Sequence, residues 1–371
     1  MQGGTVGHDL VSQFKPFQLA TRLRVPGQLL RFDARHLFHS AAPYGLRPIR
    51  LFGIAGITKA ITAPQIVLVD QSDEEPSMTL ATPSPAAAAG RFTFPGTSLS
   101  VNRMGYGAMQ LAGPHVFGPP KSEDEALAVL REAIALGIDH IDTSDYYGPH
   151  VTNRLIREAI APYPAGLVLV TKIGAWRDDK GGWILERSDD FLRKSVEDNL
   201  ERLGLARMPV VNLRMGGPGD DIAAPMRTMR SMRDEGLIDH IGISTVSMEQ
   251  LVMARDIAPV VCVQNHYNLV HRDDDAMIDG LAADGIAYVP YFPLGGFSPL
   301  QSEGLTEIAT ELGTSAQKVA LAWLLARSPN ILVIPGTSSR THLRDNIDAA
   351  SLRFGEEHKA RLDGLASTAR G

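Results

Sequence analysis

The chain has 371 residues, of which 44% are hydrophobic and 21% are charged, so it can bury a core in one or two domains. Its net charge of −6 and its pI near 6.0 give no electrostatic basis for binding nucleic acid or an anionic membrane. The single cysteine, Cys262, excludes an internal disulfide, and no apolar run reaches the roughly 20 residues of a membrane span. These features predict a soluble, cytoplasmic protein.

Residues 1–90 differ in composition from the rest of the chain. Basic residues are scattered through the first sixty positions without apolar periodicity, and the segment ends in the Ala- and Pro-rich stretch 81–90. Such a composition cannot bury a core, so it predicts a disordered or low-complexity extension of the domain at 91–371. An Arg-bearing, acid-poor start is typical of an organelle transit peptide and also of translation from a misassigned upstream start. We favour the second interpretation, with Met78 as the true start.

From Arg91 onward the pattern becomes regular. A short hairpin is expected around 92–101, and apolar strand-like runs then alternate with amphipathic helical stretches. Ser122 and Glu125 form a helix-start signal, and Gly137, Gly236 and Gly285 stand where helices end. The expected strands are 104–109, 138–142, 167–172, 210–214, 238–244, 260–264, 286–291 and 331–335. The expected helices are 123–136, 188–203, 224–235, 248–257, 276–283, 305–312, 315–326 and 341–350.

This alternation predicts an α/β protein with the (β/α)8 TIM barrel fold, preceded by a short N-terminal β-hairpin. A doubly wound Rossmann sheet is the structural alternative, because it has the same alternation of strands and helices. That fold requires the pattern Gly-x-Gly-x-x-Gly after its first strand, and 105–110 reads Gly-Tyr-Gly-Ala-Met-Gln. The barrel is therefore the better prediction.

In a barrel, the residues that end parallel strands meet on one face, and several of them here are polar. Lys172 ends an apolar strand and is costly to bury without an anion, for which Asp142 is the natural partner. A lysine near Tyr147 would lower the tyrosine pKa and make it a proton donor or acceptor near neutral pH. The alternatives are that Asp142 caps a helix, that Tyr147 packs under a loop and that Lys172 extends to solvent.

Six motifs at these strand ends, in this order along the chain, resemble those of the aldo-keto reductases. The resemblance covers Arg91 to near the C-terminus, and it implies a TIM barrel that reduces aldehydes or ketones with NADPH and without a metal. The motifs are 141–148 (Ile-Asp-Thr-Ser-Asp-Tyr-Tyr-Gly), Lys172, 242–244 (Gly-Ile-Ser), 264–265 (Gln-Asn), 291–295 (Tyr-Phe-Pro-Leu-Gly) and 334–339 (Ile-Pro-Gly-Thr-Ser-Ser).

The resemblance assigns roles to individual residues. Asp142, Tyr147 and Lys172 match three members of the catalytic tetrad of the family, in which the tyrosine gives its proton to the substrate oxygen. Gln264 and Ser244 match residues that hold the nicotinamide carboxamide, and other positions match the rest of the cofactor site. They are Tyr291, which stacks on the nicotinamide, Leu294 and Gly295 on the following loop, and Thr337, Ser338, His342 and Asn346 toward the adenosine end.

Three positions depart from the family pattern. Arg214 stands where the tetrad has histidine, and a guanidinium orients a substrate rather than relaying a proton. Thr245 replaces the usual asparagine after Ser244. Gly336 and His342 replace the cations around the adenosine 2′-phosphate, which leaves Ser338, Ser339 and Arg340 as phosphate ligands. We expect NADP rather than NAD.

Several loops, including 107–114 and 147–153, look like those of the pyridoxal reductase-like branch of the family. This branch interconverts pyridoxal and pyridoxine, and Arg214 is suited to pair with the ionised ring hydroxyl of pyridoxal. His150, on the same loop as Tyr147, is a candidate pocket wall or else a surface residue at a helix start. The alternatives in function are a general aldehyde or ketone reductase and a cofactor-binding regulatory subunit. The sequence leaves the oligomeric state open.

Overall fold

The computed structural model describes residues 22–25, 28–31, 84–296 and 302–368, and the chain divides into two units at Ser77 and Met78. Most of the expected extension at 1–90, including the proposed start at Met78, lies outside the described residues. Within the first unit, β1 (Arg22–Val25) pairs antiparallel with β2 (Gln28–Arg31). These two strands were not expected, because neither segment has an alternating apolar pattern.

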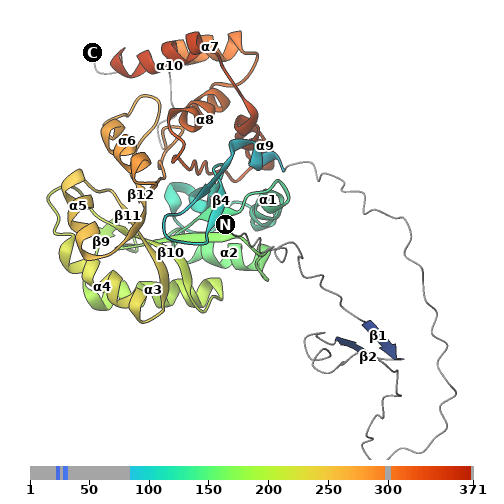
Figure 1. Cartoon of the computed structure of the whole chain (residues 1–371), viewed down its shortest axis with the longest axis vertical. Coiled ribbons are helices and arrows are strands. Elements are labelled where there is room, and N and C mark those ends of the chain that lie inside the picture. Colours follow the sequence, from blue (N-terminus) through green and yellow to red (C-terminus); the bar gives the residue numbers. More distant parts are fainter. Residues whose placement is uncertain (1–21, 26–27, 32–83, 297–301, 369–371) are drawn as a thin grey trace, which may run out of the picture. The chain divides into compact units, whose positions relative to one another are not determined.

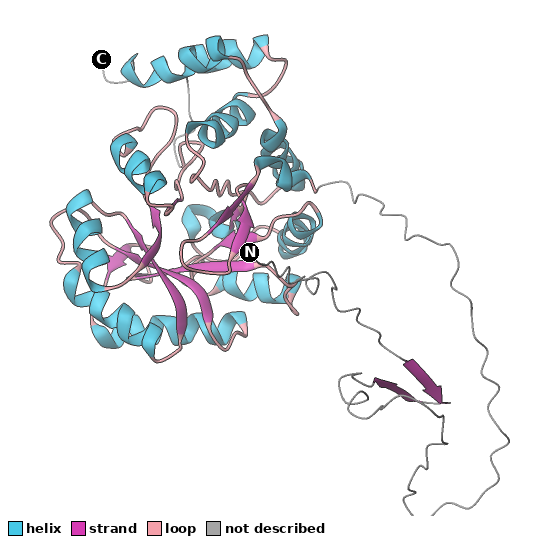
Figure 2. Cartoon of the chain, viewed as in Figure 1, coloured by secondary structure: helices cyan, strands magenta, loops and turns pink. Residues whose placement is uncertain are grey.

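The second unit is organised around a curled parallel sheet, which Figure 2 shows in magenta. The strand order in this sheet is β13-β12-β11-β10-β7-β6-β5. Each strand of the sheet therefore lies next to the strand that follows it along the chain. The neighbouring strands pair in parallel throughout. These strands are β5 (Tyr106–Gly107), β6 (His140–Asp142), β7 (Val168–Ile173), β10 (Met208–Arg214), β11 (Ile238–Ser244), β12 (Val260–Gln264) and β13 (Ala287–Tyr288).

The segment 331–336 closes the barrel between the two edges of this sheet. Tyr288 bridges to Ile331 on one side, and Met104 bridges to Val333 on the other. The amide of Gly105 donates to the carbonyl of Val333 over 2.8 Å. This segment therefore takes the place of the eighth strand, which confirms the predicted (β/α)8 barrel.

Helices pack around the strands on the outside, as Figure 1 and Figure 2 show. Both ends of the first helix follow the sequence signals. At its start, the side chain of Ser122 accepts from the amide of Glu125, and after its end Gly137 adopts a left-handed φ of 91°. The helices are α1 (Glu123–Ala135), α2 (Val151–Ile160), α3 (Asp189–Leu203), α4 (Ala223–Asp234), α5 (Met248–Ile257), α6 (Asp275–Ala283), α7 (Glu303–Glu311), α8 (Ala316–Arg327), α9 (Arg340–Asp348) and α10 (Glu356–Thr368).

The N-terminal hairpin closes one end of the barrel. It consists of β3 (Arg91–Thr93) and β4 (Ser100–Asn102), which confirms the short hairpin expected before the main fold. Phe94 and Val101 are fully buried against apolar side chains from the strands, among them Val168 and Val210. The hairpin thus excludes water from the end where the strands begin, and it leaves the ends of the strands open for a site.

The alanine-rich segment before the hairpin belongs to the barrel and not to the extension. Residues Pro85–Ala89 form a short 3-10 helix, and Ala86 is fully buried. The amide of Ala86 donates to the carbonyl of Leu136 over 3.1 Å, and the guanidinium of Arg353 donates to the carbonyl of Ala88 over 3.0 Å. The boundary expected at residue 90 is therefore too late, because composition alone does not reveal that small side chains fit against a neighbouring helix end.

Some elements of the barrel were not expected from the sequence. One is the hairpin of β8 (Ala175–Arg177) and β9 (Trp183–Leu185), which follows β7. Another is α10, which packs on α7 through an ion pair of Arg361 with Glu311. Of α2, only the start near His150 was expected. Within the described residues, no helix is long and apolar enough to cross a membrane.

Candidate active site

Asp142 is held from both sides at the end of β6. Lys172, at the end of β7, lies with its Nζ 2.5 Å from Oδ1 of Asp142, and Nε2 of Gln264 donates to Oδ2 over 2.8 Å. Both ion-pair side chains are 4% exposed, so water screens their interaction little. Lys172 also donates to the carbonyl of Thr143 over 3.2 Å. The strand register brings these groups together, because β6, β7 and β12 end at the same face of the barrel.

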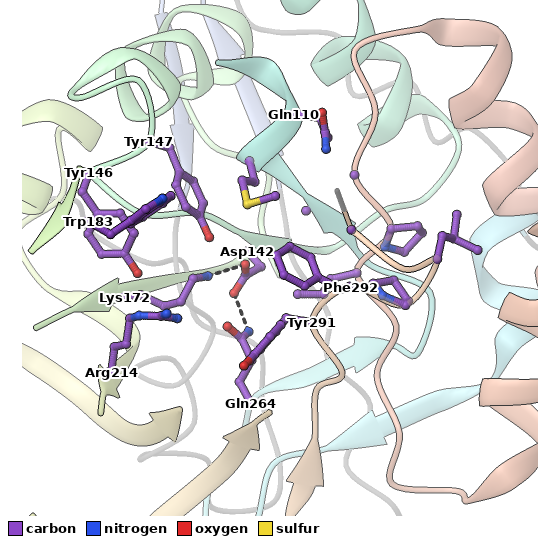
Figure 3. A pocket seen from close by; sticks show the side chains of 18 residues that line it. Gln110, Asp142, Tyr146, Tyr147, Lys172, Trp183, Arg214, Gln264, Tyr291 and Phe292 are labelled. Atoms are coloured by element: carbon purple, nitrogen blue, oxygen red, sulfur yellow. Dashed lines mark hydrogen bonds and ion pairs between the residues drawn. The ribbon is translucent and has the colours of Figure 1, made fainter. Parts of the chain in front are cut away.

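Tyr147 lies on the loop after β6 with its hydroxyl directed toward this pair (Figure 3). The ammonium of Lys172 lies 5.3 Å from the centre of the tyrosine ring. The phenol is 6% exposed, and its burial, together with the nearby Asp142 carboxylate, raises the pKa of Tyr147 well above its usual value. The expectation of a lowered tyrosine pKa is therefore wrong, because burial disfavours the phenolate more strongly than the neighbouring cations favour it.

Arg214 ends β10 beside Lys172, and its guanidinium borders the same cavity (Figure 3). Its Nε is buried and has no hydrogen-bond partner among the described residues. No carboxylate of the described residues forms an ion pair with this side chain, although most arginines of the barrel have one. The residue is half-buried, and a partly desolvated cation without an anion suits an anionic group of a ligand.

These residues share a cavity of about 450 Å³ at the carboxyl ends of the strands. Aromatic rings form much of its wall, which suits a flat ligand. Several lining residues had no role assigned from the sequence, although all but Trp183 stand in segments that the sequence singles out. Trp183 lies on the unexpected β8–β9 hairpin. These residues include Met109, Gln110, Tyr146, Trp183, Phe292 and Ile334.

The two residues expected to hold the nicotinamide carboxamide have different surroundings. Ser244 is fully buried at the end of β11, and its hydroxyl lies 3.5 Å from that of Thr245. Thr245 adopts a left-handed φ of 61°, so the chain turns sharply here. Gln264 points into the cavity but donates to Asp142. Asn265 instead bonds the backbone of Val246 and is structural.

Tyr291 and the loop after it form the opposite wall of the cavity. Its ring stacks on His266 at 5.5 Å with an interplanar angle of 8°, which fixes its orientation. Leu294 lines the cavity, and the amide of Gly295 donates to the carbonyl of Phe292 over 3.0 Å. One face of the Tyr291 ring is therefore supported from behind by His266.

The residues expected at the adenosine end lie around the start of α9. The side chains of Thr337 and Asn346 are buried, whereas those of Ser338 and His342 are exposed. Ser339 caps the helix by accepting from the amide of His342. Arg340 lies 3.2 Å from Glu125 in an exposed ion pair. The segment thus presents hydroxyl groups, helix amides and one arginine, a set of donors that suits a phosphate.

The backbones at Gly107 and Gly336 pack closely against each other in the wall of the cavity. An added Cβ at Gly107 would lie 2.5 Å from the carbonyl oxygen of Ile334, and one at Gly336 would lie 2.8 Å from that of Gly107. These glycines allow the two segments to approach, and Pro335 and Gly336 line the cavity. The residues present therefore fit a nicotinamide cofactor, which Tyr291, Gly336 and Ser338 would help to hold.

His150 does not line this cavity. Its Nδ1 lies 2.7 Å from Oδ2 of Asp145, and its side chain is 55% exposed. Asp145 also binds Arg202 and Asn153, so it directs His150 away from Tyr147. A substrate contact of His150 stays a prediction, and the contact that its side chain makes here is the one with Asp145. The alternative of a residue at a helix start agrees with the structure.

Comparison with known proteins gives the same family from sequence and from structure. The aldo/keto reductase family matches residues 103–367. The chain is 57% identical to pyridoxine 4-dehydrogenase of Escherichia coli over 74% of its own length and 98% of that protein. It is 37% identical to an uncharacterized oxidoreductase of Schizosaccharomyces pombe, over 71% and 86% of the two chains.

Solved structures share the fold. A thermostable aldo-keto reductase crystallised with the inhibitor epalrestat matches with a TM-score of 0.64 and 29% identity, over 74% of this chain and 99% of that one. An aldo/keto reductase of Klebsiella pneumoniae in complex with NADP and acetate matches with a TM-score of 0.60 and 22% identity, over 72% and 92%. The chain therefore belongs to the aldo/keto reductase family, whose members are oxidoreductases built on a (β/α)8 barrel.

Proposed function

We propose that this protein is an NADPH-dependent reductase that converts pyridoxal to pyridoxine. The observation that carries the proposal is the combination of Tyr147, beside the Lys172–Asp142 pair, with the unpaired guanidinium of Arg214 in one aromatic-walled cavity. Pyridoxal is a flat aromatic aldehyde with an ionisable ring hydroxyl, and the cavity offers matching surfaces. The name of the Escherichia coli relative supports the same substrate.

Tyr147 has the properties of the proton donor. Its pKa lies well above its usual value, so the phenol is fully protonated at neutral pH and carries a proton to give. Lys172 lies near enough to stabilise the phenolate that remains after transfer, and Asp142 holds Lys172 in place. When bound, the reduced nicotinamide supplies a hydride to the aldehyde carbon, and the proton of Tyr147 completes the alcohol.

Arg214 acts on the ring of the substrate. Its guanidinium would pair with the ionised ring hydroxyl, which lies next to the aldehyde group in pyridoxal, and so orient the aldehyde oxygen toward Tyr147. The pairing would also provide the buried Nε with a hydrogen-bond acceptor. An aldehyde without an anionic neighbour leaves this guanidinium unpaired, so the site favours pyridoxal over simple aldehydes.

The preference for NADP over NAD is the second part of the proposal. Ser338, Ser339 and Arg340 together offer hydroxyl and guanidinium donors for a 2′-phosphate at the start of α9. Arg340 forms an exposed ion pair with Glu125. Because an exposed ion pair contributes little free energy, Arg340 can leave Glu125 for a phosphate at little cost. Arg340→Ala should therefore raise the KM for NADPH and leave that for NADH unchanged.

Steady-state kinetics with purified protein test the substrate. We expect pyridoxal to have the highest kcat/KM in a panel that includes benzaldehyde, propanal and 4-pyridinecarboxaldehyde, which lacks the ring hydroxyl. Arg214→Met should remove the advantage of pyridoxal over 4-pyridinecarboxaldehyde, about tenfold or more for a charged hydrogen bond, while propanal is reduced as before. Equal activity toward the whole panel would identify a general aldehyde reductase, and binding of NADPH without turnover would identify a regulatory subunit.

A further inference from the structure

Arg177, at the end of β8, is a buried cation held by backbone carbonyls. The residue is 7% exposed, and its Nη1 donates to the carbonyl of Val116 over 2.7 Å. Nη2 donates to the carbonyls of His115 and Gly181 over 3.0 Å and 2.7 Å. No ion pair links Arg177 to a carboxylate of the described residues. Its guanidinium therefore connects two loops, a set of contacts that we call the Arg177 clamp.

The loop that receives the clamp has an unusual backbone. His115 and Val116 are consecutive non-glycine residues with left-handed φ values of 58° and 60°. Such a conformation is rare for a β-branched residue, so it persists only where other contacts fix it. Here both carbonyls point at Arg177. The carbonyl of Val116 also accepts from the amide of Gly148 over 3.2 Å, which ties the loop to the residue after Tyr147.

The clamp also supports a series of aromatic rings that ends at the catalytic tyrosine. The guanidinium of Arg177 lies 4.0 Å from the centre of the Trp183 ring. Trp183 meets Tyr146 edge-on at 5.6 Å, and Tyr146 meets Tyr147 edge-on at 5.3 Å. Trp183 lines the cavity and is 42% exposed on a short hairpin, where its ring contacts Arg177 on one side and Tyr146 on another. Figure 3 shows Trp183 and Tyr146 side by side near Tyr147.

We propose that Arg177 is a positioning residue that fixes Trp183 as the wall of the substrate end of the cavity, and thereby selects flat aromatic aldehydes. The substrate class in this inference rests on the proposed function. A ring bound over Tyr147 stacks or packs edge-on against Trp183 only if the indole is held in place. A small aliphatic aldehyde has no ring to place against Trp183, so its binding does not depend on the clamp.

The kinetic test compares Arg177→Met and Arg177→Lys with the control Arg207→Met. Arg207 forms an exposed ion pair with Asp239, where β11 begins, away from the cavity. For Arg177→Met we expect the KM for pyridoxal to rise about tenfold, as for the loss of a desolvated cation–π contact, with kcat reduced much less. The KM for propanal should stay within about twofold. Arg177→Lys should be intermediate, because an ammonium keeps the charge over Trp183 but not the three carbonyl contacts.

Equal losses for pyridoxal and propanal in Arg177→Met would overturn the proposal, because they would indicate general damage. Trp183→Phe provides a second variant that folds readily, since the side chain is half exposed. It should show the same selective rise in KM for pyridoxal. An unchanged KM ratio in Trp183→Phe would overturn the proposal as well.

A third readout does not depend on turnover. Acrylamide quenching of Trp183 fluorescence, obtained as the difference between a protein and its Trp183→Phe version, should increase in Arg177→Met without any ligand. Unchanged quenching would overturn the clamp. If the wild type reduced propanal but not pyridoxal while quenching increased as expected, the substrate would be wrong and the clamp right. Failure of the proposed function and failure of this inference are therefore distinguishable.

Discussion

Gln264 donates a hydrogen bond to Asp142 over 2.8 Å, on the carboxylate oxygen that Lys172 leaves free. The residue expected to hold the cofactor carboxamide thus also fixes the acid that pairs with Lys172. The side chains of Gln264, Asp142 and Lys172 are all buried, so this contact is part of the protein core and does not depend on a bound cofactor. Gln264 therefore has a structural role in addition to any role in binding.

The first prediction concerns this hydrogen bond. Gln264→Leu leaves one buried carboxylate oxygen without a donor, so the free energy of unfolding should fall by about 1–3 kcal/mol. The measurement is urea unfolding of the protein without cofactor. Gln110→Leu is the control, since Gln110 borders the same cavity but is exposed and makes no hydrogen bond with the described residues. If Gln264 served the cofactor alone, both variants would unfold like the wild type.

The second prediction concerns the buried ion pair. Asp142→Asn leaves the Lys172 ammonium, 4% exposed, without its anion, and should cost about 3–5 kcal/mol of stability. Asp139→Asn removes the partner of Arg91 at a more exposed site and should cost less than about 1 kcal/mol. Both are read from urea unfolding at pH 7. Similar losses in the two variants would contradict the buried, unscreened character of the Asp142–Lys172 pair.

The third prediction concerns Tyr147, the proposed proton donor. Tyr147→Phe removes only the hydroxyl, so the fold should persist and kcat should fall by about 10²–10⁴ for loss of a general acid. Tyr163→Phe is the control, because Tyr163 does not line the cavity and its hydroxyl donates to the carbonyl of Leu203. Quenching of protein fluorescence by NADPH should be the same in both variants. A Tyr147→Phe protein with wild-type kcat would exclude this residue as the donor.

The barrel and its central pair were predictable because both depend on patterns that tertiary contacts do not override. The strands are apolar runs bounded by turn residues, and β11, β12 and α5 have the bounds expected. Asp142 and Lys172 end two neighbouring strands of such a sheet, so the fold alone brings them together.

The features that were missed depend on contacts distant in sequence. The β8–β9 hairpin consists of two short strands, of which β9 is exposed throughout, and its turn is held by Asp178, which accepts from the amides of Lys180 and Gly182. An Asp-Asp-Lys-Gly-Gly turn between two tryptophans is the signal from which it was recognisable. The upward shift of the Tyr147 pKa depends on burial, and the orientation of the His150 side chain depends on Asp145, which also binds Arg202. Neither burial nor such contacts can be seen in a linear sequence pattern.

The fourth prediction concerns alkaline pH. Burial raises the pKa of Tyr146 to about 12, and that of Tyr147 is raised as well, above the usual value near 10 of the unfolded chain. Between these values the folded protein binds more protons than the unfolded chain, so stability is complete below about pH 10 and is lost as pH rises toward 12. Urea unfolding at pH 9 and pH 11 measures this loss, which should be smaller in Tyr146→Phe. An unchanged pH dependence in that variant would contradict the assignment.

The same titration fixes the pH dependence of turnover. Because Tyr147 stays protonated well above neutrality, kcat for reduction should be independent of pH from about 6 to 9 as far as this donor is concerned. Oxidation of pyridoxine needs the phenolate as base, so kcat in that direction should rise with pH over the same range. Profiles of kcat in both directions test this, with D2O exchange to report proton transfer. A reduction rate that fell between pH 7 and pH 9 would indicate a donor with a lower pKa.

The last prediction concerns the start of the barrel. The 3-10 helix Pro85–Ala89 buries Ala86 and Ala89 and provides carbonyls for Arg353 and Arg103. A protein that begins at Met78 keeps these contacts and should unfold at the same urea concentration as the full chain, with the same kcat/KM. One that begins at Arg91 loses them and should be less stable by about 2 kcal/mol, from two buried methyl groups and the lost hydrogen bonds. Equal stability of the two shortened proteins would show that the domain begins at 91, as composition suggested, and that the contacts of Ala86 contribute nothing.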